Sequence, residues 1–445
     1  MATAHSPSNY NDFVRENAAI PVANPARQRE LDLEPRDLIR KSRLVHRAGR
    51  LALGAGHGSY RVKAHMQRVG SAVGLDVVNS SVSLTEITTT AERDGIFRTE
   101  VSEVRPMGIN ADRLAELEQY IGNLPPRVPT GQISAELDRI DAKEQLYATP
   151  ISALAAGIAC AGFAFLNGGG LVECLVVLCA AFCGQYIRRM LLHHSINQVA
   201  VTMLVAAVAS LIYLGLVSLF ATLFPGAGQH IAGYTSAVLF LVPGFPLVTG
   251  FLDLARLDLS AGISRLTYAL LILGTAGIAV WAVSAVVGLE PQPMTGADIA
   301  PLMLWVLRAL TSFLAVFGFA VLFNSPMRMA LGAALIGMAA NVLRLVAVNT
   351  WHWEPQAAAF LAALVVGLLA RLVATPLGVP RITISVPAVV IMVPGVLAYR
   401  AIFEVNAGST ITAIGFGVEA ALVVLALAVG LGVARMLTDR DWTLE

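Results

Sequence analysis

The chain has 445 residues, of which 56% are hydrophobic and only 14% are charged, and its formal net charge is +1. Soluble domains carry about 25% charged residues, so this composition excludes an ordinary soluble protein. A net charge near zero, without a basic stripe, argues against a nucleic-acid partner. The charge is unevenly placed, because all three lysines precede Pro150 and none follows it. We therefore expect a polar N-terminal part and a membrane part.

The polar part is expected to contain a tail and a domain. Residues 1–35 lack the apolar stretch of a signal peptide and are predicted to form a disordered tail. Residues 36–147 combine helical and strand patterns, which predicts a small cytoplasmic α+β domain with a hairpin turn at Asp94 and Gly95. Its expected elements are two helices, two strands and two further helices, over 37–56, 60–75, 77–92, 96–105, 110–124 and 132–146.

The loop after the first helix places His57 and Ser59 among glycines. Such a loop could hold a nucleophile or a phosphate, but neither G-x-S-x-G nor a Walker pattern is present. We favour a structural or regulatory loop and keep a membrane-bound hydrolase as the weaker alternative. The four cysteines lie in apolar runs, so neither a disulfide nor a metal site is expected, and no cofactor is predicted.

The membrane part contains ten apolar windows of about 20 residues, each long enough to cross a hydrocarbon core about 30 Å thick. They form two sets of five, over 148–290 and 291–437, followed by a cytoplasmic tail over 438–445. The windows are 150–167, 170–187, 198–220, 231–252, 263–288, 299–323, 328–349, 355–376, 382–403 and 409–436.

Arginine in the connecting loops indicates the orientation of these windows. With a cytoplasmic N-terminal domain, the even-numbered loops face the cytoplasm, and the odd-numbered loops contain neither arginine nor lysine. The positive-inside rule then predicts ten spans of a bacterial inner membrane, with both termini in the cytoplasm. The cytoplasmic arginines are Arg188, Arg189, Arg256, Arg265, Arg328, Arg381, Arg435 and Arg440.

The fourth and ninth windows both contain Val-Pro-Gly, at 242–244 and 393–395. The matched motifs predict two five-helix repeats, and because five is odd the second repeat is inverted. Inverted repeats with matched breaks are typical of secondary transporters, whose broken helices expose backbone groups to a substrate or ion. The predicted fold is thus an α-helical polytopic membrane protein of ten transmembrane helices with an N-terminal soluble α+β domain. The candidates at the breaks are Pro243, Gly244, Pro394 and Gly395.

Charged residues inside the windows are further candidates, because they are costly at the bilayer centre unless they face a cavity or a partner. Arg308 and Glu419 are expected near mid-depth. They could pair, or Glu419 could take a coupling proton while Arg308 holds a substrate carboxylate. The other candidates are Asn341 with Arg344, Arg400, which can also snorkel to the interface, and Asp253, Asp258 and Arg265.

Three stretches, LGAGHGSYRVKAHMQRVGSAVGLDV, RPMGINADRLAELEQYI and LVPGFPLVTGFLDLARLDLSAGISR, resemble the threonine/serine exporter (ThrE-like) family. FAVLFNSPMRMALGAALIGMAANVLR resembles the smaller module of that family, so the resemblance covers residues 36–436. Thr249 departs from the family pattern, in which a polar amide often stands there. The pattern around the fourth window falls on Pro243, Gly244, Pro246, Asp253, Asp258, Gly262 and Arg265.

The resemblance implies a ten-helix exporter of small hydroxy-amino acids, L-threonine and L-serine, driven by the proton-motive force. Its partners would be the amino acid, protons and the lipid bilayer, with a homo-oligomer as an open possibility. Some relatives resemble exporters of dicarboxylates such as succinate, which is the alternative substrate class. The implied activity is transport rather than catalysis.

Overall fold

The computed structural model describes residues 25–104, 108–194, 196–223, 231–288 and 299–439. Residues 1–24 of the predicted tail, the predicted loops over 224–230 and 290–298, and the C-terminal tail from Arg440 lie outside the described residues. Helix α2 spans Pro25–Gly54, so the predicted tail is wrong for residues 25–35. Proline suits the first helical position, and the Arg, Glu and Leu residues that follow are good helix formers.

The described N-terminal part combines helices with one antiparallel sheet of strand order β1-β2-β3. Its elements are α2, α3 (Ser59–Val73), β1 (Val77–Val82), β2 (Glu86–Arg93), β3 (Ile96–Glu103), α4 (Ala111–Gly122) and α5 (Thr130–Ala142). Apolar side chains from the helices and the sheet, among them Met66, Ile87, Leu117 and Ile133, form one buried cluster. This part therefore packs around a hydrophobic core of its own.

The sheet has three strands where the sequence predicted two. The run 77–92 is divided by a turn in which Ser83 Oγ accepts hydrogen bonds from the N–H groups of Thr85 and Glu86, at 3.3 and 3.0 Å. A serine side chain that competes for backbone donors favours a turn over a continuous strand. The hairpin turn predicted at Asp94 and Gly95 is confirmed, because both residues have positive φ, 52° and 77°.

The described residues after α5 are mostly helical, and the chain is a polytopic membrane protein. By length and composition, eight of the described helices can cross a membrane. They are α6 (Thr149–Leu166), α7 (Leu171–His193), α8 (Gln198–Leu223), α11 (Leu259–Val287), α12 (Pro301–Leu322), α13 (Met327–Asn349), α14 (Pro355–Leu377) and α17 (Thr410–Thr438).

Both windows that contain Val-Pro-Gly are interrupted helices. The fourth consists of α9 (Ile231–Ser236), the short 3₁₀ helix η1 (Leu239–Leu241) and α10 (Gly244–Ala255), and it bends by 62°. The ninth consists of α15 (Ile382–Val390) and α16 (Gly395–Asn406). Proline lacks the N–H that continues a helix, so each helix stops at its motif. If the bent fourth window is counted as one span, the described residues contain up to nine membrane spans. The ten spans predicted from the sequence stay a prediction.

Helices α6 and α12 pack closely through small residues. A methyl group on Gly162 would lie 2.8 Å from Thr311 O, and one on Gly318 would lie 2.5 Å from Ala155 O. As the residue number rises along one helix it falls along the other, so the two helices are antiparallel. Glycine lets the backbones approach, which is how membrane helices gain packing contacts.

The close approach of α6 and α12 makes Gly318 sensitive to substitution. Gly318→Ala is expected to push the helices apart and to lower the free energy of unfolding by about 1–3 kcal/mol, the usual cost of overpacking. Thermal unfolding of the detergent-solubilised full chain measures this loss. Gly274→Ala in α11 is the matched control, because a methyl group there meets nothing within 4 Å. Equal midpoints for the two variants would contradict the close approach.

The helix contacts of the first five windows recur in the second five. Helix α10 packs against α11 and α17, and its counterpart α16 packs against α17 and α11. The two breaks also meet. A methyl group on Gly244 would lie 3.1 Å from the Val390 side chain, and one on Gly395 would lie 2.5 Å from Leu239 Cδ2. Each Val-Pro-Gly break therefore packs against the segment that leads into the other.

Candidate functional site

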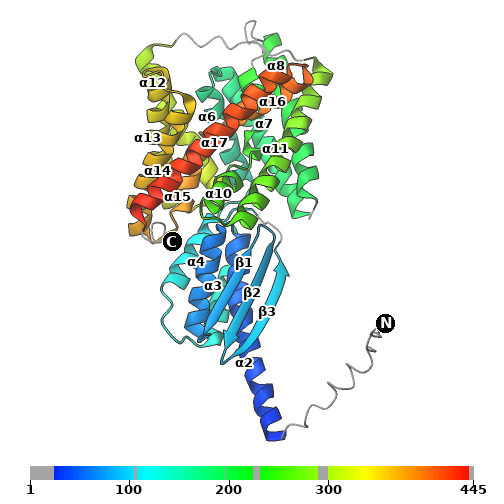
Figure 1. The fold of residues 1–445 in the computed structure, drawn as a ribbon. Coiled ribbons are helices and arrows are strands. Elements are labelled where there is room, and N and C mark those ends of the chain that lie inside the picture. The colour runs from blue at the N-terminus through cyan, green and yellow to red at the C-terminus, as the bar shows by residue number, and fades with distance from the viewer. Residues whose placement is uncertain (1–24, 105–107, 195, 224–230, 289–298, 440–445) are drawn as a thin grey trace, which may run out of the picture.

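The N-terminal part docks against one end of the membrane helices, below α10 in Figure 1. The first turn of α3 makes the central contact, because the backbone N–H of Ser59 donates to Asp253 Oδ1 at 3.1 Å. Asp253 of α10 thus caps a helix that begins 194 residues earlier, and a carboxylate is favourable at a helix N-terminus. Gly58 permits the contact, because a methyl group there would lie 3.2 Å from the same oxygen.

Asp253 and Arg265 form a buried ion pair. Arg265 Nε lies 3.1 Å from Asp253 Oδ2, and the two side chains are 3% (Arg265) and 1% (Asp253) exposed. Arg265 also donates from Nη1 to Thr249 Oγ1 at 3.1 Å and from Nη2 to the backbone oxygen of His57 at 2.6 Å. The pair therefore joins α10, α11 and the loop before α3 in one polar cluster, in which protein groups replace water as partners of the charges.

Asp258, just before α11, extends this cluster. Ser59 Oγ donates to Asp258 Oδ2 at 2.5 Å, and the Lys63 ammonium donates to both carboxylate oxygens at 2.7 and 2.9 Å. Helices α10 and α11 approach closely here, since a methyl group on Gly262 would lie 2.9 Å from Gly250 O. The structure thus brings together four residues of the fourth-window pattern, Asp253, Asp258, Gly262 and Arg265, with Thr249, the candidate that departs from that pattern.

A cavity of about 240 Å³ lies beside this cluster, between the N-terminal part and the membrane helices. One wall is the broken helix at 242–246, which includes the predicted Pro243, Gly244 and Pro246. The charged lining residues are Arg188, Arg189 and Arg265, and none of the described lining residues is Asp or Glu. The cavity is therefore electropositive. Its hydrogen-bonding side chains include Gln145, Ser152, Gln185, Gln198, Tyr268 and Asn324.

Arg188 and Arg189 are charged lining residues that the sequence did not single out as site residues, and Arg188 differs from its neighbour in its contacts. For Arg188, the Nε atom is buried and has no hydrogen-bond partner among the described residues. Arg189 donates to Tyr147 O at 3.1 Å. Arg265 Nε also makes no hydrogen bond among the described residues, but it lies 3.1 Å from Asp253 Oδ2 in an ion pair. A buried guanidinium N–H without an acceptor is costly, which points to an acceptor supplied by a ligand. The sequence showed only an arginine pair at a helix end, which the positive-inside rule already explained.

The structure does not bring Arg308 and Glu419 together. The Arg308 guanidinium lies over the Trp305 ring, 4.9 Å from its centroid. Helix α12 packs mainly against α6 and α13, whereas α17 packs mainly against α14 and α16. Neither Arg308 nor Glu419 lines the cavity. Their roles as carboxylate ligand and proton site stay predictions.

The remaining predicted residues lie in the second set of helices. Arg344 Nε donates to Asn341 Oδ1 at 3.0 Å, and Asn341 Nδ2 donates to Ser312 Oγ at 2.8 Å, which forms a second polar chain between α12 and α13. The Arg400 guanidinium lies 5.9 Å from the centroid of the Phe416 ring. Pro394 and Gly395 stand at the break before α16. These residues are separate from the cluster around Asp253.

The hydrolase alternative lacks the geometry of a nucleophile and its base. The Ser59 hydroxyl donates to Asp258, and neither ring nitrogen of His57 has a hydrogen-bond partner among the described residues. A catalytic serine needs an activating base, but His57 makes no hydrogen bond to Ser59, and the Asp258 carboxylate is already bound through both oxygens by the Lys63 ammonium. The loop of His57 and Ser59 instead makes contacts that join the N-terminal part to the membrane helices.

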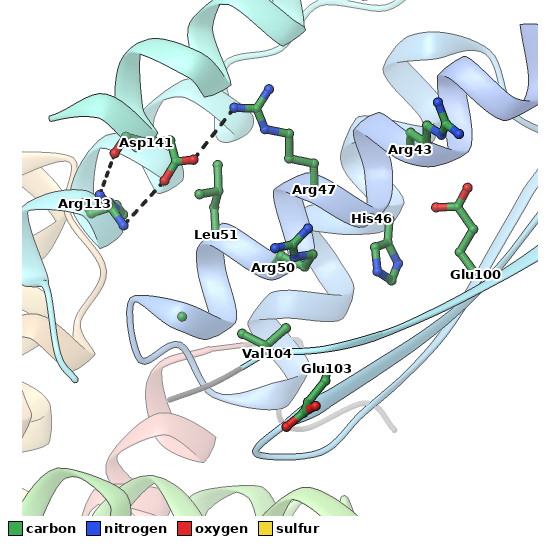
Figure 2. Close-up of a pocket in the computed structure, with 11 residues that line it drawn as sticks. Arg43, His46, Arg47, Arg50, Leu51, Glu100, Glu103, Val104, Arg113 and Asp141 are labelled. Carbon is green, nitrogen blue, oxygen red and sulfur yellow. Dashed lines mark hydrogen bonds and ion pairs between the residues drawn. The ribbon is translucent and has the colours of Figure 1, made fainter. Parts of the chain in front are cut away.

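A larger cavity of about 710 Å³ lies in the N-terminal part, between α2 and the sheet (Figure 2). Figure 2 shows Arg43, Arg47 and Arg50 on the α2 side of this cavity. Glu100 and Glu103 of β3 line the opposite side. Its lining thus carries both signs of charge and comes from the polar part alone. We assign this cavity no part in a path across the membrane.

Two family profiles match the chain in tandem. The profile described as "Putative threonine/serine exporter" matches residues 43–287, and the profile described as "Threonine/Serine exporter, ThrE" matches residues 308–437. The chain belongs to the threonine/serine exporter family. Membership of this exporter family makes the chain a transporter rather than an enzyme.

Two relatives of this exporter carry the name "Probable succinate transporter subunit YjjP". The protein from Escherichia coli (strain K12) is 29% identical over 228 residues, which is 50% of this chain and 86% of that protein. The protein from Klebsiella aerogenes is 29% identical over 201 residues, which is 44% of this chain and 75% of that protein. No solved structure matches the exporter.

Proposed function

We propose that this exporter is a secondary transporter of small dicarboxylates, of the size and charge of succinate. The observation that carries the proposal is the electropositive cavity, which Arg188, Arg189 and Arg265 line without a described carboxylate side chain. Arginine binds carboxylates through two parallel hydrogen bonds, so a dianion suits this lining. At about 240 Å³ the cavity is smaller than the roughly 300–1,000 Å³ typical of drug-sized ligands, which suits a small metabolite.

L-Threonine and L-serine, the substrates first expected from the resemblance, are the second candidate, and the description of the family favours them. An amino acid also needs an acceptor for its ammonium group. The carboxylates that neighbour the lining residue Arg265, Asp253 and Asp258, already bind Arg265, Ser59 and Lys63. The relatives named as probable succinate transporter subunits favour the dicarboxylate.

An inverted repeat belongs to the same proposal, with 148–290 and 291–437 as its halves. Antiparallel packing of α6 and α12, the first helices of the two halves, supports it. The reciprocal contacts of α10 with α17 and of α16 with α11 support it too. Broken helices that meet at the interface of two inverted repeats are the usual binding site of secondary transporters.

The proposed orientation places both termini in the cytoplasm of a bacterial cell, with protons as the coupling ion and Glu419 as their site. Arg256 and Arg435 support this orientation, because both contact Tyr60 of α3. These arginines therefore lie at the end of the membrane helices that the N-terminal part contacts. The positive-inside rule assigns that side to the cytoplasm. The word "subunit" in the names of the relatives supports an oligomer as the assembled form, and we propose a homo-oligomer.

Purified full-length protein in liposomes tests this function. Liposomes loaded with labelled succinate or labelled L-threonine receive a proton gradient, and efflux is followed with and without a protonophore. We expect the gradient to accelerate succinate efflux, the protonophore to remove that acceleration, and L-threonine to leave at the background rate. L-Threonine efflux with succinate at background would reverse the order of the candidates. Background rates for both would reject the proposal.

A further inference from the structure

Two histidines and a glutamate converge in the N-terminal part, directly behind the loop that contacts Arg265. His57 precedes α3, His65 lies on α3 and Glu118 lies on α4. Glu118 Oε2 is 3.0 Å from His65 Nε2 and 3.8 Å from His57 Nε2. One ligand atom from each residue lies within 4.8 Å of the other two. Ligand atoms of a tetrahedral zinc site are roughly 3.3 Å apart, so small side-chain rotations suffice to bring the three onto one ion.

His57 has no partner that explains its burial. Its side chain is 1% exposed, and neither ring nitrogen makes a hydrogen bond with a described residue. The rings of His57 and His65 meet edge to face, with centroids 5.1 Å apart, which orders the His57 imidazole without giving its nitrogens a hydrogen bond. Buried polar groups without partners are costly and rare, so an orphan imidazole aimed at a carboxylate indicates a missing ligand.

We propose that His57, His65 and Glu118 bind one Zn²⁺ ion through His57 Nε2, His65 Nε2 and Glu118 Oε2. Two imidazoles and one carboxylate are a ligand set that Zn²⁺ favours, with water in the fourth position. Arg61 Nη1 lies 3.3 Å from the other carboxylate oxygen, Oε1, and so leaves Oε2 for the metal. His65 then carries its proton on Nδ1. This site departs from the sequence analysis, which predicted no metal.

The ion would fix the junction described above. The backbone oxygen of His57 accepts a hydrogen bond from Arg265 at 2.6 Å, so the loop that holds the metal also holds the buried ion pair. The site is structural or regulatory, because none of its ligands lines the cavity of about 240 Å³. Its existence does not depend on which substrate the transporter carries.

Zinc binding to the purified full-length protein tests the site. The protein in detergent is stripped with a chelator and titrated with Zn²⁺ by calorimetry, and with Co²⁺ by visible absorption. We expect one Zn²⁺ per chain, a Co²⁺ spectrum of a tetrahedral site, and a higher thermal midpoint with Zn²⁺. Glu118→Gln and His65→Gln, which nearly conserve volume, should each lose the stoichiometric binding, the spectrum and the thermal shift.

The matched control is the double variant His193→Ala, His194→Ala. These two neighbouring histidines are exposed at the end of α7, with ring centroids 6.0 Å apart, and are the obvious place for adventitious binding. The control should keep one Zn²⁺ per chain. Stoichiometric binding that survives in both Glu118→Gln and His65→Gln, or that is lost in the control, overturns the proposal. If one of the two test variants fails to fold, the Co²⁺ spectrum of the other decides.

Discussion

Asp253→Ala is expected to destabilise the full chain by about 3–5 kcal/mol, the usual cost of breaking a buried ion pair by removing one partner. The substitution leaves Arg265, 3% exposed, without its carboxylate and also removes the cap of α3. Thermal unfolding of the detergent-solubilised protein measures the loss. Asp138→Ala is the control, because Asp138 is 63% exposed and its ion pair with Arg47 should contribute less than about 1 kcal/mol.

The double variant Asp253→Leu, Arg265→Met separates stability from transport. Replacing both charges by apolar side chains of similar volume is often neutral or stabilising, so we expect it to recover much of the stability lost in Asp253→Ala. We also expect it to lose transport, because Arg265 lines the cavity and Thr249 loses its donor. Efflux at the wild-type rate from a stable double variant would reduce the pair to a purely structural role.

Arg188→Ala is expected to weaken the apparent affinity for a dicarboxylate roughly ten- to 150-fold, because a hydrogen bond to a charged group contributes about 1.5–3 kcal/mol. The protein should still fold, since Arg188 Nε has no hydrogen-bond partner to lose among the described residues. Concentration-dependent efflux from liposomes measures the change. Arg188→Lys should recover part of the affinity, because it restores the charge without the bidentate geometry.

Arg308→Ala is the matched control for Arg188→Ala, because it removes the same side chain from a membrane helix. The cavity geometry predicts that Arg308→Ala transports normally, since Arg308 does not line the cavity and lies over Trp305. The depth of Arg308 in its window predicts the opposite. If Arg308→Ala abolishes transport while Arg188→Ala transports normally, the substrate carboxylate binds in the second set of helices and the assignment to Arg188 is wrong.

Helix positions and breaks could be predicted from the sequence because their signals are local. The apolar windows fix the helices, and proline with glycine stops a helix wherever it stands, so α10 and α16 both begin at the glycine of Val-Pro-Gly. The third strand was missed because strand alternation continues across Ser83, and only the hydrogen bonds of its hydroxyl reveal the turn.

The site could be predicted only in part, because its contacts join elements that are far apart in the sequence. Window position predicts the depth of a residue but not the neighbours that its helix face meets, so Arg308 and Glu419 were expected at one depth, and the structure does not bring them together. The family pattern placed Asp253 and Arg265 in one site, yet nothing local shows that the N–H of Ser59 completes it from 194 residues away. Arg188 was overlooked because an arginine at a helix end already has an explanation in the positive-inside rule.

The cap that Asp253 provides for α3 has a consequence for the order of assembly. A chain is made from its N-terminus, and N-terminal domains generally fold first. Here α3 is synthesised long before Asp253, which caps it. The hydrogen bond between Arg435 and Tyr60 forms later still, because Arg435 lies near the end of α17. Until Asp253 has been made, the N-terminal part presents an uncapped helix end. The contact between Tyr60 and Arg435 needs α17, so the junction is complete only after the whole membrane part has been made.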